Sequence, residues 1–244
     1  MVRLSLDVGS ARAASVNDPT SPAALARVLR TAKYVLLDFD GPVCSVFSAV
    51  PAAGVADSMR RQLGLADPPV TEDPLVVLHL AAAVSAAAGR QAHDLLVAAE
   101  LTAIGGAEPT AGSAEFLATC HELGRQVAIV SNNSGEAIAA YLADHRLEPL
   151  VAAICGRDSQ DMNLMKPNPH VLLQALTALG SAPGQAVVIG DSDSDMAAAA
   201  SAGTVAIGLA NKTHKRTSLV ATGAAAVVSS MSVITAALRS TSKR

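Results

Sequence analysis

The sequence predicts an α/β fold, a doubly wound parallel sheet that carries a smaller, inserted all-helical domain. Short, continuously apolar segments alternate along the chain with segments of helical pattern, as expected for strands that are buried on both faces. Of the 244 residues, 50% are hydrophobic but only 2% are aromatic, so small aliphatic side chains must pack helices against the sheet. The long interval between the first two apolar segments contains no convincing strand, which predicts the insertion.

The order of the elements follows from these segments and from helix-start signals. Ser21 and Pro22 predict the first helix, with the serine as N-cap and the proline in the first turn. A later helix is predicted with Asn168 as N-cap, Pro169 in its first turn and Gly180 as its stop. The six predicted strands are YVLLD (34–38), QVAIVS (126–131), VAAIC (151–155), AVVIG (186–190), TVAIG (204–208) and AAAVV (224–228).

The interval after the first strand has the pattern of consecutive helices. These are AAGVADSMRRQLG (52–64), DPLVVLHLAAAVSAAAGR (73–90), QAHDLLVAAELTAIGG (91–106) and SAEFLATCHELG (113–124), the last leading back into the sheet. A crossover between parallel strands needs only about a dozen residues. We therefore expect residues 48–108 to form a helical cap, residues 21–47 and 109–244 to form the core, and residues 1–20 to be a flexible leader.

Charge, hydropathy and cysteine usage exclude several classes of protein. A formal net charge of −3 with no Lys/Arg run argues against a nucleic-acid partner. The longest apolar run, residues 74–89, is shorter than the roughly 20 residues that cross a bilayer, so no membrane partner is expected. Cys44, Cys120 and Cys155 form no C-x-x-C pair, so we expect three small buried side chains in a reducing, cytoplasmic location.

Polar side chains gather where the predicted strands end. Asp38 and Asp40 follow the first strand, Ser131 to Asn133 end the second, and Asp191 to Asp195 follow the fourth. Ligands of parallel sheets bind at the carboxyl ends of the strands, so we expect these groups at one edge, with Lys166 beside them. Neighbouring carboxylates repel unless a cation is present, and Mg²⁺ prefers oxygen ligands and often a substrate phosphate. A lysine and a hydroxyl nearby are suited to a phosphoryl group.

Four segments in this order resemble the motifs of the haloacid dehalogenase superfamily. They are DFDGPV (38–43), SNN (131–133), the lysine of MKPNPH (165–170) and GDSDSD (190–195). The resemblance covers residues 32–232 and implies a Rossmannoid core. The insertion after the first motif is similar to the mobile helical cap of the phosphoglycolate-phosphatase-like branch.

The resemblance implies roles for the acidic residues. Asp38 would attack phosphorus and form an aspartyl-phosphate, for which an anionic carboxylate needs no deprotonation. Asp40 would act as general acid and base, and its backbone carbonyl would join Asp38 and Asp191 in binding Mg²⁺. The implied activity is hydrolysis of a small phosphomonoester metabolite.

The same resemblance implies a phosphate-binding set. Ser131 and the Asn132 N–H would hold the transferring phosphoryl group, and Lys166 would neutralise it and orient the nucleophile. Asp195 would support the metal site from behind or hydrogen-bond Lys166. Asp193 is expected to be a cap or loop residue rather than a ligand.

Two observations narrow the chemistry, and two alternatives stay open. Asp40 favours phosphoryl transfer over dehalogenation, and the absence of lysine between Lys33 and Lys166 argues against the Schiff-base chemistry of phosphonate-cleaving relatives. Pro42 replaces the Thr or Val usual in the first motif and removes an amide donor. The alternatives are a sugar-phosphate mutase of the same fold and a non-catalytic binding protein. The oligomeric state, monomer or dimer, is not predicted.

Residues of the predicted cap should choose the substrate. The five that could reach a second anionic group or a hydroxyl of the substrate are Arg60, Arg61, His79, Arg90 and His93. Of these, His79 is expected to be a core residue, because it interrupts an apolar helix. The arginine pair is expected on a solvated helix face.

Overall fold

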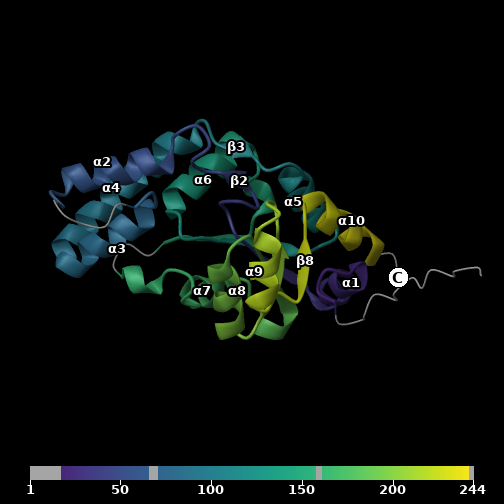
Figure 1. The fold of residues 1–244 in the computed structure, drawn as a ribbon. Coiled ribbons are helices and arrows are strands. Elements are labelled where there is room, and N and C mark those ends of the chain that lie inside the picture. The colour runs from purple at the N-terminus through teal and green to yellow at the C-terminus, as the bar shows by residue number, and fades with distance from the viewer. Residues whose placement is uncertain (1–17, 66–70, 158–160, 242–244) are drawn as a thin grey trace, which may run out of the picture.

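The computed structural model describes residues 18–65, 71–157 and 161–241 (Figure 1). Six strands form one sheet in the order β5-β4-β1-β6-β7-β8, and every neighbouring pair is parallel. They are β1 (Tyr34–Leu37), β4 (Gln126–Val130), β5 (Ala153–Cys155), β6 (Ala186–Gly190), β7 (Val205–Leu209) and β8 (Ala226–Val228). All six predicted strands are present. The strand order reverses at β1, so the site expected at its end lies at the topological switch point.

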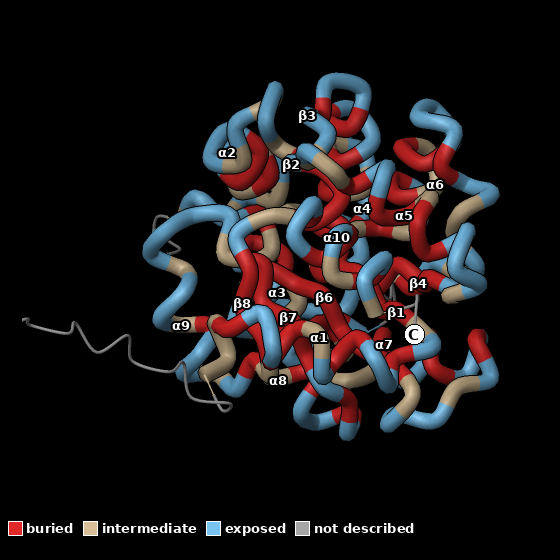
Figure 2. Tube along the Cα trace, turned by 90° about the vertical axis from the view of Figure 1, so that its right-hand side faces the viewer, coloured by how far each residue is buried: buried red, intermediate tan, exposed pale blue. Residues whose placement is uncertain are grey.

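Helices cover both faces of the sheet, which confirms the doubly wound arrangement. One face is covered by α1 (Pro22–Thr31), α5 (Ser113–Glu122), α6 (Gly135–Asp144) and α10 (Met231–Thr241). The other is covered by α7 (His170–Ala178), α8 (Asp193–Ser201) and α9 (Lys215–Ala221). Neighbouring strand residues face opposite layers: Leu37 packs in the first layer and Leu36 in the second, both fully buried. Buried segments accordingly run along the strands in Figure 2.

The first helix starts at the predicted signal. The Ser21 hydroxyl accepts the N–H of Ala24, and Pro22 opens α1. Residues 1–17 of the predicted leader lie outside the described residues. Its last three residues are anchored rather than flexible, since the Val227 N–H donates to the Pro19 carbonyl at 2.8 Å.

The start of α7 differs by one residue from the prediction. Pro169 is the N-cap, and the helix begins at His170. Asn168, the predicted N-cap, still accepts the N–H of His170 through its side chain at 3.0 Å. Gly180 follows the helix with φ of 60°, as its predicted role as a stop requires. Three short 3₁₀ helices complete this part of the fold: η1 (Glu148–Leu150), η2 (Met162–Leu164) and η3 (Pro183–Gln185).

The insertion after β1 forms three helices with a hydrophobic core of their own. They are α2 (Ala52–Gln62), α3 (Pro74–Val84) and α4 (Ala86–Ile104), which pack through side chains such as Met59, Leu78 and Leu96. The predicted boundary between residues 90 and 91 is wrong. The chain turns at Ser85, which is extended and caps α4 through the N–H of Ala88. The limits 48–108 of the cap stay a prediction.

A small two-stranded antiparallel sheet lies at the base of the insertion, in the interval where no strand was predicted. β2 (Cys44–Ser45) pairs antiparallel with β3 (Glu108–Pro109), so the chain enters and leaves the cap side by side. Each strand has two residues, too few to give a hydrophobic pattern. The Ser48 hydroxyl extends this junction by accepting the Glu108 N–H at 2.8 Å.

Among the described helices, none has the length and apolar character needed to cross a membrane. The thiols of Cys44, Cys120 and Cys155 are buried and free, as expected of small core residues.

Candidate active site

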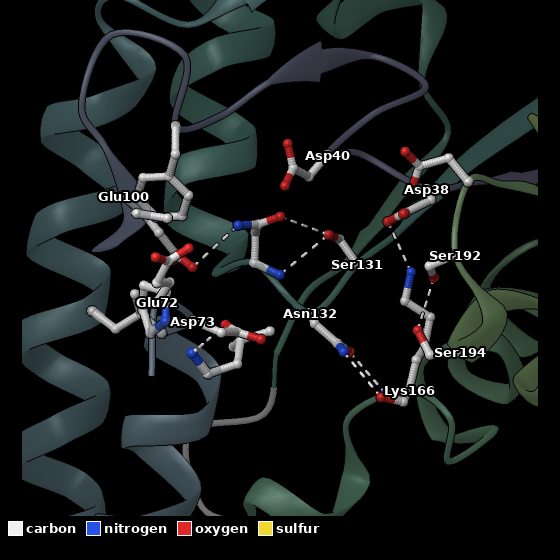
Figure 3. A pocket seen from close by; sticks show the side chains of 17 residues that line it. Asp38, Asp40, Glu72, Asp73, Glu100, Ser131, Asn132, Lys166, Ser192 and Ser194 are labelled. Carbon is white, nitrogen blue, oxygen red and sulfur yellow. Dashed lines mark hydrogen bonds and ion pairs between the residues drawn. The ribbon is translucent and has the colours of Figure 1, made fainter. Parts of the chain in front are cut away.

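The carboxyl ends of β1, β4 and β6 open into a cavity of about 370 Å³ that is closed on its far side by the cap (Figure 3). Six of the seven predicted site residues line it: Asp38, Asp40, Ser131, Asn132, Lys166 and Asp191. The seventh, Asp195, is fully buried and contacts Lys166. The strand-end argument therefore brings all seven residues together.

Lys166 connects the acidic residues on the sheet side of this cavity. Its buried ammonium donates to Asp38 Oδ1 at 2.8 Å, to Asp195 Oδ1 at 2.5 Å and to the Val130 carbonyl at 3.0 Å. Burial alone would lower the pKa of Lys166, but the two carboxylates outweigh it and raise the pKa above its ordinary value. The Asn132 side chain holds the lysine backbone from both sides, accepting its N–H at 2.8 Å and donating to its carbonyl at 3.1 Å.

Asp38 is held in a single orientation at the end of β1. Its Oδ1 accepts the Lys166 ammonium and the N–H of Phe39, the latter at 2.8 Å. Within the described residues, each of its carboxylate hydrogen bonds goes to Oδ1, so Oδ2 is left for another partner. Burial raises the pKa of Asp38, and the nearby Asp195 raises it further against the opposing effect of Lys166.

Asp40 lies at the open mouth of the cavity. Its Oδ1 accepts the Val46 N–H at 2.9 Å, which fixes the carboxylate across the turn that leads into β2. Although the residue is exposed, loss of hydration among the cavity walls raises its pKa, and the Val46 hydrogen bond partly offsets this. Pro42 is buried in this turn, whose Gly41 and Val43 amides already donate within the turn.

Asp195 supports Lys166 by accepting a hydrogen bond from its ammonium group. One oxygen accepts the ammonium, and the other accepts the Ser192 N–H at 3.1 Å and hydroxyl at 2.6 Å in a capping box at the start of α8. Both oxygens are therefore engaged, as a supporting role requires. Asp193 points away and accepts the hydroxyl of Ser218, in agreement with its prediction as a loop or cap residue.

Gly190 makes room for this arrangement, and it gives a testable prediction. An added Cβ would overlap the Asp195 carboxylate, so Gly190→Ala should displace Asp195 from Lys166. We expect a loss of about 1–3 kcal/mol in the free energy of unfolding, measured by denaturant titration. Gly54→Ala in α2 is the control, because its methyl group meets nothing within 4 Å and a helical alanine is favoured by up to about 1 kcal/mol. Equal stability of the two variants would contradict this account.

The acidic cluster has the chemistry of a divalent-metal site. Asp38, Asp191 and Asp195 each offer a carboxylate oxygen, and these atoms lie within 4.8 Å of one another. Both Asp195 oxygens are engaged by Lys166 and Ser192, whereas the hydrogen bonds of Asp38 and Asp191 among the described residues each go to one carboxylate oxygen. Asp38 and Asp191 therefore each keep an oxygen that fits a metal.

A second lysine, which was not predicted as a site residue, lies beside the acidic cluster. Lys215 of α9 donates to Asp191 Oδ2 at 2.5 Å, and Asn211 donates to the same oxygen at 3.2 Å. Both follow β7, so applying the strand-end rule to the fifth predicted strand would have identified this region.

Ser131 anchors the predicted phosphate loop between β4 and α6. Its buried hydroxyl donates to Asn133 Oδ1 at 3.0 Å and accepts the Asn133 N–H at 3.2 Å. Ser134 caps α6 by accepting the N–H of Ala137, so the positive end of this helix faces the loop.

A buried cluster, here called the Glu100 clamp (His93, Glu100, Asn133, Ser134 and Arg157), ties this loop to the cap helix α4. Arg157 donates to both Glu100 oxygens, at 2.8 and 3.2 Å, and to the Asn132 carbonyl at 2.7 Å. Glu100 also accepts the Asn133 amide at 3.2 Å and the Ser134 N–H at 3.0 Å. The Arg157 Nε donates to His93 at 3.3 Å. Burial, followed by the Arg157 charge, lowers the pKa of His93.

The predicted substrate-contacting residues of the cap do not line the cavity. Arg60 and Arg61 pair with Asp57, at 3.3 and 2.9 Å. His79 is exposed, contrary to the expected core position, and lines a separate hollow with Arg90. On the side of the insertion, the cavity is lined by Phe47, which precedes the cap, and by the cap residues Ala52, Glu72, Asp73, Pro74, Leu75, Leu96 and Glu100.

Comparisons with known proteins identify relatives of this chain. Residues 32–203 match the model of the haloacid dehalogenase-like hydrolase family. The phosphoglycolate phosphatase of Salmonella typhi is 31% identical over 96 residues, which are 39% of this chain and 37% of that protein. Pyrophosphatase PpaX of Halalkalibacterium halodurans is 32% identical over 105 residues, 42% of this chain and 48% of that one. The matched regions thus span less than half the length of either relative.

A solved structure extends the similarity to most of the chain. A hydrolase from Pseudomonas syringae superimposes with a TM-score of 0.68 at 17% identity, over 86% of this chain and 98% of that one. This likeness concerns the fold alone. The family match runs over most of the chain and contains all four motifs, so the protein belongs to the haloacid dehalogenase-like hydrolase family.

Proposed function

We propose that the protein is a Mg²⁺-dependent phosphatase that hydrolyses a small phosphomonoester through a phospho-aspartate at Asp38. The observation that carries the proposal is the contact of the Lys166 ammonium with Asp38 Oδ1, which leaves Oδ2 for attack at the end of the cavity. The relatives named phosphatase and pyrophosphatase support phosphoester chemistry. The free, buried cysteines support a reducing, cytoplasmic location.

The residues present can carry both halves of the reaction. Asp38 Oδ2 forms a bond to phosphorus while the ester P–O bond breaks, and Asp40 gives its proton to the leaving oxygen. Asp40 then takes a proton from water as the water oxygen attacks phosphorus, which releases phosphate and restores Asp38. Ser131 and the Asn132 N–H would bind the phosphoryl oxygens, and Lys166 would neutralise their charge.

A metal ion fits the same site. Asp38 and Asp191, with the backbone carbonyl of Asp40, would hold Mg²⁺, and Asp195 would support the set through Lys166. When bound, the ion supplies positive charge to the phosphoryl oxygens.

Phosphate release from a panel of phosphorylated metabolites tests the proposal. We expect at least one small phosphomonoester to be hydrolysed with Mg²⁺, release to stop with EDTA, and activity to return with added Mg²⁺. Stoichiometric release without an activating bisphosphate distinguishes hydrolysis from a sugar-phosphate mutase. Hydrolysis that persists in EDTA would contradict the metal requirement, and no release from any ester would favour a binding protein.

A further inference from the structure

We propose that the alcohol part of the substrate carries no negative charge, and that phosphomonoesters of amino alcohols are preferred over phosphorylated carboxylic acids and bisphosphates. The inference rests on the proposed function and concerns the half of the cavity opposite the phosphoryl site. It follows from the charges that line this half.

The cavity has two chemically different ends. At the core end, the Lys166 ammonium and the Ser131 hydroxyl are suited to an anionic phosphoryl group. At the cap end, Figure 3 shows the carboxylates of Glu72, Asp73 and Glu100 on the side away from Asp38. The apolar surfaces of Leu75 and Leu96 lie with them. A substrate whose phosphoryl group reaches the core end therefore presents its alcohol part to the cap acids.

The three cap carboxylates are not equally available. Glu100 is neutralised by Arg157 and fully hydrogen-bonded within the Glu100 clamp. Asp73 uses Oδ1 to accept the Leu75 N–H at 2.8 Å, which also satisfies the positive end of α3. Within the described residues, no hydrogen bond or ion pair is formed by the Glu72 carboxylate. Glu72 and the second oxygen of Asp73 thus remain to meet the substrate.

Within the described residues, Glu72 and the free oxygen of Asp73 have no cationic partner. Among the described residues, Lys166 is the one lysine or arginine that lines the cavity. The two internal segments outside the described residues, 66–70 (ADPPV) and 158–160 (DSQ), contain no lysine or arginine. The arginines of the cap lie elsewhere: Arg60 and Arg61 pair with Asp57, and Arg90 lines the separate hollow.

The charge of these acids predicts an order of preference among substrates that differ in the charge of the alcohol part. A substrate carboxylate or second phosphate would lie beside Glu72 and Asp73 in a partly enclosed cavity, where like charges repel more strongly than in water. An ammonium group gains from the same carboxylates, and a hydroxyl group can hydrogen-bond to them at little cost. The expected order of kcat/KM is cationic, then neutral, then anionic.

Three esters of matched size test this order: phosphoethanolamine, 2-hydroxyethyl phosphate and phosphoglycolate. They differ mainly in the terminal group, which is an ammonium, a hydroxyl or a carboxylate. We expect kcat/KM for phosphoethanolamine to exceed that for phosphoglycolate by at least about 10-fold at low salt, and the ratio to fall as salt is added. Inhibition of p-nitrophenyl phosphate hydrolysis by each ester gives the same ranking independently.

Charge variants identify the residues responsible. The double variant Glu72→Gln/Asp73→Asn should bring the ratio close to one, through a fall in kcat/KM for phosphoethanolamine and a rise for phosphoglycolate. Asparagine also caps helices well, so α3 should keep its N-terminal cap. Glu72→Lys should invert the order. Glu122→Gln on α5 is the control, since it removes one exposed acid outside the cavity and should keep the preference.

The outcomes separate this inference from the proposed function. Phosphate release from the panel with a preference for phosphoglycolate, or with no preference among the three esters, overturns the inference alone. An unchanged ratio in the Glu72→Gln/Asp73→Asn variant also overturns it. No release or inhibition with any phosphomonoester overturns the proposed function itself.

Discussion

Asp38→Asn should abolish phosphate release from every substrate that the wild-type protein hydrolyses, with kcat lowered at least about 10³-fold. The asparagine keeps the size of the side chain and an oxygen that can accept the Lys166 ammonium. It lacks the anionic Oδ2 that attacks phosphorus. Turnover is measured on the best panel ester, and acid-quenched phosphoprotein should be detected for the wild type and absent for the variant.

Stability provides the check that this variant is folded. Burial raises the pKa of Asp38, so its ionised form is unfavourable in the native state, and an uncharged amide should leave the melting temperature unchanged or raise it. Asp193→Asn is the matched control, two residues after Asp191 but bonded to Ser218 away from the cavity, and should keep wild-type turnover. Wild-type turnover in Asp38→Asn would rule out Asp38 as the nucleophile.

The sequence was sufficient to predict the sheet and the core half of the candidate site. Strands buried on both faces have a strong signal, a continuous apolar run, and parallel topology makes the residues after those runs neighbours. That rule alone brought Asp38, Ser131 and Asp191 to one edge, where the structure has them.

Features that depend on tertiary partners were not predictable in the same way. The Glu100 clamp joins residues 57 positions apart, one inside the long helix α4 and one after the short strand β5, and neither position has a distinctive local pattern. The helix break at Ser85 was missed because alanines continue on both sides of it. The exposure of His79 depends on which face of α3 packs against the other two cap helices. A helix so uniformly apolar does not indicate that face.

Arg157→Met should be the most destabilising single change, by about 3–5 kcal/mol. It leaves Glu100 buried at 1% exposure without its cationic partner, and removes the donor to the Asn132 carbonyl. For a chain of this size, the melting temperature should fall by roughly 6–20 °C. Arg61→Met is the control, because its ion pair with Asp57 is exposed and such pairs contribute about 0–1 kcal/mol.

A double-mutant cycle of Arg157→Met with Glu100→Gln measures how much the ion pair itself contributes to the free energy of unfolding, apart from the other contacts of the clamp. Glutamine is uncharged and keeps an acceptor for the Asn133 amide or the Ser134 N–H, so the double variant should be more stable than Arg157→Met alone. Additive losses in the cycle would mean that the two charges do not stabilise each other.

The same cycle measured in kcat/KM decides whether the clamp serves the reaction as well as the fold. Arg157 and Glu100 contact the backbone and side chains of residues 132–134, so their loss should misplace the loop that is proposed to bind the phosphoryl group. We expect kcat to fall in Arg157→Met at a temperature where the protein is still folded, with Arg157→Lys recovering part of it. Lysine restores the charge but cannot donate to both Glu100 oxygens and the Asn132 carbonyl in one plane. If stability falls while kcat and KM stay at wild-type values, the clamp holds the cap to the core without positioning the loop.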